Sequence, residues 1–314
     1  MKIYPEKIHR LYDAFIPIGN LFSFNKYALN NNERYGPFFI VGSGRSGNTL
    51  LRKLLNNHSA VHIPPETYVL GSVINRFRQN AAMKWPDLVD YVFSTFEYYP
   101  EFETFGLNIR PLVQKLKNIS TNNRNLAFLL NSFYQYHGDH IGVQCARWGD
   151  KTPYNTFFLE RILSVFPDAK FIHMLRDGVD VVSSYMNAKL YDSLEKAVER
   201  WCLSVKLVGK FQKSHPDVVL TVRYEEFVTN PQAVLLNICD FLEIDFELQI
   251  LQHNTTFQHM GDVEVYEHHA NVLNPVSAKS IGKGRSNLTL KEKVLIQKMM
   301  DPQLIDLGYD KCMS

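Results

Sequence analysis

Short apolar runs alternate along the chain with longer segments whose mixed apolar and polar pattern predicts helices. The apolar runs have the length of strands and occupy residues 37–42, 61–63, 170–175 and 218–222. The run at 170–175 is apolar on both faces, which is typical of a strand buried in a parallel sheet. The pattern therefore places several buried strands between helices.

Helices are predicted between and after these strands. They cover 47–57, most of 87–140 with breaks at Pro100 and Pro111, 154–166, the residues after Gly178, 192–213 and the residues after Arg223. Glu66 and Thr67 are predicted to lie in the first turn of a further helical stretch. This alternation predicts an α/β fold with a central, mainly parallel sheet flanked by helices, whose ligands bind at the carboxyl ends of the strands.

The chain divides into an N-terminal extension over 1–35 and a single domain over 36–314. Residues 68–140 are rich in Phe, Tyr and Asn, and we interpret them as a helical insertion because no Gly/Ser-rich linker sets them apart. Residues 261–287 are polar and contain glycine, which predicts a loop. We expect the aromatic-rich residues 11–24 to pack on the core, with a partner or a membrane surface as alternatives.

The first strand runs into a glycine-rich turn that contains a cation. Gly42, Gly44 and Gly47 permit positive φ and close approach of the backbone, and the following helix offers free N–H groups and its dipole to an anion. The spacing from Gly42 to Gly47 fits the first half of a nucleotide P-loop. Asn48 stands where that motif has Lys, however, and Arg45 lies inside the turn. We interpret the turn as a phosphate-binding loop unlike that of an ordinary ATPase or kinase; the alternative is a plain strand–turn–helix corner.

Composition narrows the classes of protein that fit. The 314 residues are 45% hydrophobic, which is enough for a sizeable core, and the net charge of +2 argues against a dedicated nucleic-acid binder. Four widely spaced cysteines without a C-x-x-C pair indicate thiols of a reducing compartment. No targeting segment stands out and no run reaches the length of a membrane span, so we expect a cytoplasmic protein.

Several motifs resemble those of the sulfotransferases that use 3′-phosphoadenosine 5′-phosphosulfate (PAPS), over roughly residues 36–290. Among branches of that family, the chain is most similar to the tyrosylprotein sulfotransferases and related bacterial enzymes. The motifs are Arg45-Ser46-Gly47-x-Thr49-Leu50, Pro65-Glu66-Thr67, Asp150-Lys151-x-Pro153, the stretch from Phe166 to Gly178, and Ile281-Gly282-Lys283. The resemblance implies a P-loop-like sulfotransferase fold, PAPS as donor and no required metal.

The resemblance also implies two phosphate-binding regions. Arg176, and Ser184 eight residues later, would hold the 3′-phosphate of PAPS. The alternatives are a structural clamp between Arg176 and Asp177 or Asp180, and Ser183 in place of Ser184. The 5′-phosphosulfate end would be held by Gly44, Arg45, Ser46, Gly47, Asn48, Thr49 and Leu50.

Three later residues complete the implied donor site. Tyr224 corresponds to a tyrosine that contacts adenine or phosphate, and its alternative is an ordinary core aromatic. Lys283 would reach the phosphate from a lid, with help from Arg285, whereas a flexible basic loop is the alternative.

For catalysis, the resemblance implies Glu66 as general base and Lys151 with Arg45 as cations on the transferring group. Glu66 alternatively stabilises the dipole of a helix, and Lys151 alternatively pairs with Asp150 or faces solvent. Sulfuryl transfer moves a group with less negative charge than a phosphoryl group, so cations can replace Mg²⁺.

Departures from the tyrosylprotein branch leave the acceptor open. Tyr68 stands where that branch has an arginine that helps to read an acidic peptide, and His268 and His269 stand near a serine position without ligands at metal spacing. We expect a hydroxyl-bearing acceptor, whether carbohydrate, lipid, small molecule or tyrosyl group, with 68–140 as its wall. A P-loop kinase and a non-catalytic nucleotide-binding protein are the alternative functions. The oligomeric state stays open, a homodimer included.

Overall fold

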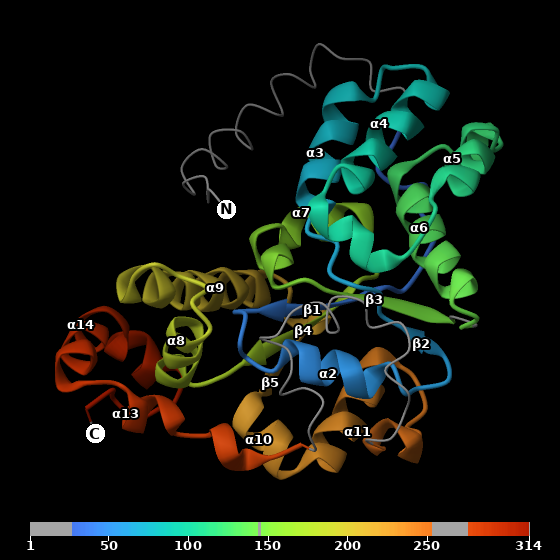
Figure 1. The fold of residues 1–314 in the computed structure, drawn as a ribbon. Coiled ribbons are helices and arrows are strands. Elements are labelled where there is room, and N and C mark those ends of the chain that lie inside the picture. The colour runs from blue at the N-terminus through green and yellow to red at the C-terminus, as the bar shows by residue number, and fades with distance from the viewer. Residues whose placement is uncertain (1–26, 144–145, 253–275, 314) are drawn as a thin grey trace.

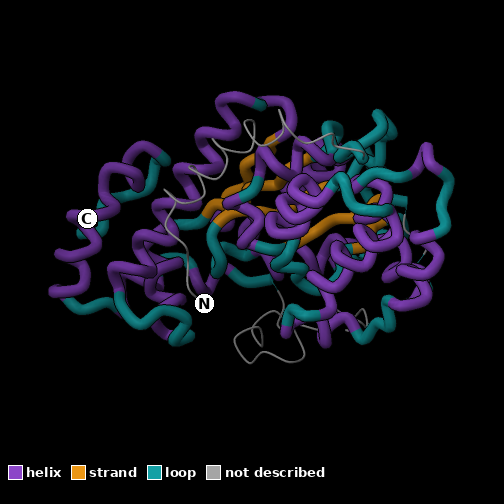
Figure 2. Tube along the Cα trace, turned by 90° about the horizontal axis from the view of Figure 1, so that it is seen from above, coloured by secondary structure: helices purple, strands orange, loops and turns teal. Residues whose placement is uncertain are grey.

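A computed structural model describes residues 27–143, 146–252 and 276–313. Its centre is a sheet of five parallel strands in the order β2-β3-β1-β4-β5. The strands are β1 (Phe38–Gly42), β2 (Val61–His62), β3 (Arg147–Lys151), β4 (Lys170–Leu175) and β5 (Val219–Arg223). Seen from above, the strands run through the interior with helices on both sides (Figure 2). The predicted α/β fold with a parallel sheet is confirmed.

Strand β1 is the middle strand of the sheet, and all five of its residues are therefore buried. Successive side chains point to opposite faces, so Phe38 and Ile40 join one core cluster while Phe39 and Val41 join another. Cross-strand register sets Ile40 beside both Lys151 and Ile172. The strand therefore aligns the ends of β3 and β4 with the turn that follows Gly42.

Strand β3 was not among the predicted strands. Its sequence, Arg-Trp-Gly-Asp-Lys, carries no apolar run, yet the strand is buried from Trp148 to Lys151. Trp148 stacks on Tyr134 with ring centroids 3.8 Å apart, and a Cβ on Gly149 would overlap the ring of Phe38. Tertiary packing, rather than local propensity, makes this segment a strand.

Helices cover the two faces of the sheet in separate groups (Figure 1). On one face lie α2 (Asn48–Leu55), α10 (Tyr224–Thr229) and α11 (Pro231–Leu242). The other face carries α3 (Leu70–Asn80), α4 (Trp85–Glu97), α5 (Arg110–Lys117), α6 (Leu126–His140), α7 (Leu159–Val165) and α9 (Leu194–Ser214). A third cluster joins α8 (Gly178–Asn187), α9 and α14 (Leu290–Asp306), with α13 (Lys283–Asn287) against α8. Short 3-10 helices connect these elements at Pro100–Phe105, Thr121–Asn123, Pro153–Phe157, Pro216–Val218, Leu248–Leu251 and Ala278–Ser280.

The helical insertion predicted at 68–140 corresponds to α3–α6. The end of the N-terminal extension packs on it, since the ring of Tyr27 meets Trp85 edge-on at 5.0 Å. The backbone N–H of Ala127 also donates to the carbonyl of Leu29 at 2.8 Å. Residues 27–29 therefore belong to the same packed body as the domain, whereas 11–24 lie outside the described residues.

The described cysteines are free thiols. Burial raises the pKa of Cys239 to about 11, and raises the pKa of Cys202 to a similar value. Cys145 lies outside the described residues. Within the described ranges, no helix is both long and apolar enough to span a bilayer.

Candidate functional site

The turn between β1 and α2 is shaped by residues with positive φ. Gly42, with φ 124°, donates its N–H to Thr156 Oγ1 at 2.9 Å, and a Cβ there would lie 2.6 Å from the carbonyl oxygen of Met174. Gly47, with φ 95°, is the residue before α2, and its N-cap position makes no side-chain hydrogen bond. Arg45 also adopts positive φ, at 64°. The turn thus leaves the start of α2 open to an anion.

Two arginines meet at this turn. Arg45 Nε donates to Ser184 Oγ at 3.1 Å, and Arg176 Nη1 donates to the backbone carbonyl of Arg45 at 3.1 Å. Burial lowers the pKa of the Arg45 guanidinium; Tyr185 partly offsets this effect, and the charge of Arg176 adds to it. Two partly buried cations held this close are stabilised by a bound anion.

Buried polar atoms at the turn lack partners among the described residues. Ser46 Oγ and Arg176 Nε are both buried, and neither atom has a hydrogen-bond partner among the described residues. Buried polar groups of this kind are normally satisfied, so they mark where ligand oxygens fit. Asn48 Oδ1 is a further buried atom without a partner among the described residues, but the amide Nδ2 of Asn48 donates to the carbonyl of Ser43 at 2.8 Å. The residue that replaces the P-loop lysine therefore braces the turn.

Besides the carbonyl of Arg45, three further residues contact Arg176 at the end of β4. Its guanidinium lies 4.4 Å from the ring centroid of Tyr224, and Nη2 donates to the carbonyl of Ser280 at 2.7 Å. Asp180 Oδ2 lies 3.6 Å from the same Nη2, beyond a hydrogen bond. Asp177 pairs instead with Arg285. Of the two aspartates considered as clamps for Arg176, Asp180 forms an ion pair with it and Asp177 does not.

Ser184 rather than Ser183 faces the turn, because its hydroxyl accepts from Arg45 while Ser183 is buried in α8. Tyr224 closes the turn from the other side: a Cβ on Gly47 would lie 2.6 Å from its ring. The structure brings the turn, Arg176, Ser184 and Tyr224 together. Thr49 and Leu50 are half-buried in the first turn of α2.

A second group lies at the end of β3. Lys151 forms an ion pair with Glu66, and both side chains are buried, at 0% and 7% exposure. The prediction of Glu66 in the first turn of a helix is wrong, because α3 begins only at Leu70. Glu66 therefore stands on a connecting segment rather than at a helix terminus. Its predicted alternative as a dipole-stabilising residue loses its structural basis.

Asp150 holds that connecting segment in place. It is fully buried and accepts hydrogen bonds from Thr67 Oγ1 at 2.8 Å, Tyr134 Oη at 2.7 Å and Asn155 Nδ2 at 2.8 Å. Burial raises the pKa of Asp150, and the donated hydrogen bonds oppose that rise. From the sequence, Asp150 was considered only as a partner for Lys151; in the structure Lys151 pairs with Glu66, and Asp150 binds Thr67, Tyr134 and Asn155 instead.

Thr156 was also missed, although it ties the 3-10 helix that follows β3 to the glycine-rich turn. Its hydroxyl both accepts from the N–H of Gly42 and donates to the carbonyl of Gly42, at 2.9 and 3.1 Å. Because Lys151 pairs in register with Ile40, it lies two residues short of the turn on the neighbouring strand. The Glu66–Lys151 pair and the cationic turn thus belong to one edge of the sheet.

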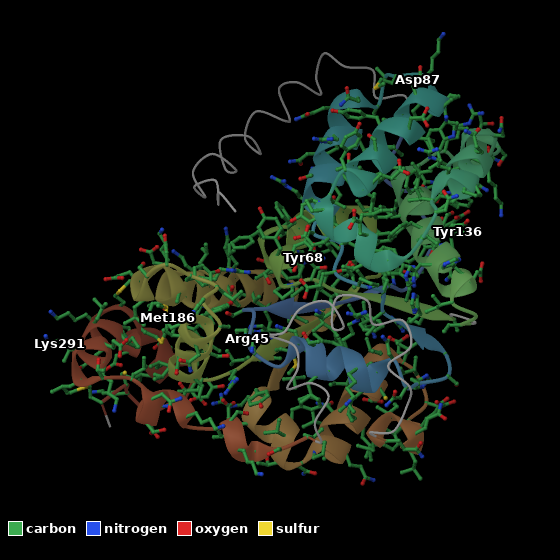
Figure 3. The ribbon with its side chains drawn as sticks, viewed as in Figure 1. Arg45, Tyr68, Asp87, Tyr136, Met186 and Lys291 are labelled. Carbon is green, nitrogen blue, oxygen red and sulfur yellow. The ribbon has the colours of Figure 1, made fainter. Side chains whose placement is uncertain are left out.

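Tyr68, two residues after Glu66, has a backbone conformation with positive φ. Its φ is 55°, and its ring stacks on Tyr99 with centroids 5.5 Å apart. Figure 3 places Tyr68 above Arg45, towards the helical insertion. A half-buried aromatic pair therefore begins two residues after Glu66.

The region predicted as a loop over 261–287 is only partly described. Residues 283–287 form α13, so that part of the prediction is wrong. Lys283 is exposed at the start of this helix, and Arg285 is engaged by Asp177 and by the carbonyl of Asp310 at 2.8 Å. His268 and His269 lie outside the described residues. Within the described residues, no group of three His, Cys, Asp or Glu side chains is arranged to hold a metal ion.

Gly47→Ala should destabilise the protein by about 1–3 kcal/mol, because the added Cβ meets both an unfavourable φ and the ring of Tyr224. Gly209→Ala is the matched control, since Gly209 lies inside α9 with open space around it and should gain about 1 kcal/mol. Urea unfolding measures both. Equal effects of the two substitutions would contradict the assigned geometry of the turn.

Comparison with known proteins identifies the family of the chain. A model of the sulfotransferase family matches residues 37–248, which is more than half of the chain. Protein-tyrosine sulfotransferase 1 from Danio rerio is 26% identical over 285 residues, covering 87% of this chain and 72% of the relative. Protein-tyrosine sulfotransferase A from Caenorhabditis elegans is 24% identical over 288 residues, covering 88% and 68%.

Solved structures share the fold. The sulfotransferase domain from the Synechococcus PCC 7002 olefin synthase superposes with a TM-score of 0.60 at 21% identity, covering 92% of this chain and 98% of that domain. The sulfotransferase domain from the curacin biosynthetic pathway gives a TM-score of 0.58 at 23% identity, covering 89% and 100%. The predicted fold class is thereby confirmed.

Proposed function

Because the chain belongs to the sulfotransferase family, we propose that it transfers a sulfonate group from PAPS to a hydroxyl group of an acceptor. The observation that carries this proposal is the cationic turn with unsatisfied buried atoms, next to a buried Glu66–Lys151 pair. The turn offers an anion site, and the pair offers a base and a cation beside it.

For the donor, the chain has residues that fit both phosphates. Gly44 to Leu50 would hold the 5′ end, with the free Ser46 Oγ and the open start of α2 facing its oxygens. Arg176 and Ser184 would hold the 3′-phosphate, and Tyr224 would pack beside it. Lys283 would approach from α13, whereas the bonds that Arg285 makes to Asp177 and Asp310 suit a supporting role.

For the reaction, Glu66 would accept the proton of the acceptor hydroxyl as that oxygen forms its bond to sulfur. The bond between sulfur and the 5′-phosphate oxygen breaks, and 3′-phosphoadenosine 5′-phosphate (PAP) leaves with its electron pair. Lys151 and Arg45 would stabilise the charge on the transferring and leaving oxygens. These cations supply what Mg²⁺ supplies in phosphoryl transfer, so the reaction should need no metal.

The acceptor is a hydroxyl-bearing molecule. The proposal has two forms, which differ in the chemical class of that molecule. The relatives named above are protein-tyrosine sulfotransferases, which favours a tyrosyl group. The stacked Tyr68 and Tyr99 favour a carbohydrate, lipid or small phenolic acceptor, because aromatic rings pack on apolar and planar faces. A kinase is disfavoured because Asn48 braces the turn instead of offering a charge.

Calorimetric titration with PAP tests the donor site, with ADP as control and EDTA in place of metal. We expect micromolar binding of PAP and much weaker binding of ADP, which lacks the 3′-phosphate. A preference for ADP that requires Mg²⁺ would replace the proposal with a kinase. Absence of PAP binding would also overturn it.

Arg176→Ala should weaken PAP binding about 10- to 150-fold, since a hydrogen bond to a charged group contributes about 1.5–3 kcal/mol. Binding of AMP, which has no 3′-phosphate, should change much less. Arg223→Ala is the matched control, because Arg223 packs on Tyr309 and donates to the carbonyl of Leu307. Equal losses for PAP and AMP would remove Arg176 from the 3′-phosphate site.

A further inference from the structure

Asp180 joins two segments that are about a hundred residues apart in the sequence. Its side chain is 0% exposed in α8. Oδ2 accepts from the N–H of Gly282 at 2.8 Å, and Oδ1 accepts from the N–H of Gly284 at 2.7 Å. Each carboxylate oxygen thus binds one amide of the segment 280–284, which we call the strap.

The strap lies directly on the backbone of α8. A Cβ on Gly284 would overlap the carbonyl group of Val179 and the Cα of Asp180. Gly282, with φ 74°, turns the chain into α13 so that both amides point at the same carboxylate. The closeness of the two backbones means that the strap has little freedom to shift while Asp180 holds it.

The strap in turn contacts the donor site through Ser280. The carbonyl of Ser280 accepts from Arg176 Nη2 at 2.7 Å, and its hydroxyl shares a hydrogen bond of 2.6 Å with Tyr224 Oη. Lys283 lies between the two glycines whose amides Asp180 binds. The positions of Arg176, Tyr224 and Lys283 therefore depend on where the strap sits.

We propose that Asp180 is a positioning residue for the donor nucleotide. By fixing the strap to α8, and by its own contact of 3.6 Å with Arg176 Nη2, it sets the orientation of Arg176 and Tyr224 and brings Lys283 towards the 3′-phosphate region. It touches neither the donor nor the reacting atoms. This inference rests on the proposed function, because it concerns the same donor site.

Asp180→Asn tests the inference with almost no change in side-chain volume. Asn has one acceptor oxygen, so it must release one of the two strap amides. The Kd for PAP and the KM for PAPS should rise about tenfold, while kcat at saturating donor stays within about threefold. Hydrogen exchange of the amides in 280–284 should become faster in the variant.

Two further variants separate positioning from a general loss of stability. Asp301→Asn is the matched control: Asp301 is also buried and accepts from the N–H of Cys312 at 3.0 Å, but at the C-terminal turn. Its PAP affinity should equal that of the wild type, whatever its melting temperature. Gly284→Ala should weaken PAP binding with Asp180 intact, because its Cβ pushes the strap off α8.

The outcomes distinguish this inference from the proposed function. If the wild type does not bind PAP, the donor site itself fails. If the wild type binds PAP and Asp180→Asn binds it equally well, the positioning role is overturned. Should the variants fail to fold, the wild type still decides: PAP should slow hydrogen exchange across 280–284, and unchanged exchange would refute the inference.

Discussion

Replacing Glu66 by Gln should lower the turnover number about 10²- to 10⁴-fold, the usual contribution of a general base. The Kd for PAP should stay within about twofold, because Glu66 pairs with Lys151 on β3 rather than with the donor turn. Gln keeps the size and the hydrogen-bonding reach of the side chain but cannot take a proton. Transfer of labelled sulfonate to the best of a panel of phenolic, sugar and tyrosyl-peptide acceptors gives the rate, and calorimetry gives the affinity.

Glu243→Gln is the control for this substitution, since Glu243 also pairs with a lysine, Lys170, at a distant and exposed place. Its turnover should match that of the wild type. Near-normal turnover of the Glu66 variant would remove this carboxylate from the mechanism. A large loss of PAP affinity would make it part of the donor site.

The sequence predicted the elements whose signal is local. The strands β1 and β4 are apolar runs, and the glycines of the turn between β1 and α2 are required by the φ of Gly42 and Gly47. The contact between Arg45 and Ser184 was not predicted, because the resemblance assigned Arg45 to the 5′ end of the donor and Ser184 to its 3′-phosphate, whereas the structure joins the two side chains. The site residues that lie on such motifs could therefore be identified from the sequence, while their roles stay predictions.

What the sequence could not predict depends on contacts between distant segments. Strand β3 forms because Gly149 fits against Phe38 and Trp148 against Tyr134. Glu66 lies outside any helix because Asp150 and Thr152 hold Thr67 in a connecting segment. The bonds from the strap to Asp180 likewise have no counterpart in local pattern.

The turn between β1 and α2 and the Glu66–Lys151 ion pair differ in how their charges are balanced. At the turn, Arg45 and Arg176 bring two positive charges together; burial lowers the pKa of Arg45, and the charge of Arg176 adds to that effect. At the end of β3, Lys151 and Glu66 neutralise each other. An anion that enters the turn therefore meets cations already in place, whereas the group beside the turn is an ion pair. We expect this arrangement to suit an anionic donor and a neutral hydroxyl acceptor.

Lys151→Met should both abolish transfer and destabilise the protein by about 3–5 kcal/mol. Removing one partner of a buried ion pair leaves the carboxylate of Glu66 buried without its cation. The double variant Glu66→Gln/Lys151→Met should recover most of that stability, because no charge is then left uncompensated, yet it should transfer no sulfonate. Urea unfolding gives the stabilities, and the labelled-donor assay gives the rates.

Lys170→Met supplies the comparison, because its partner Glu243 is 75% exposed, and an ion pair in contact with water contributes little to stability. Full transfer by the Lys151 variant would make this lysine purely structural. A double variant as unstable as Lys151→Met would mean that packing, rather than the unpaired carboxylate, sets the cost. Lost transfer with restored stability in the double variant would assign the Glu66–Lys151 pair as a unit to the chemistry, since folding could no longer explain the defect.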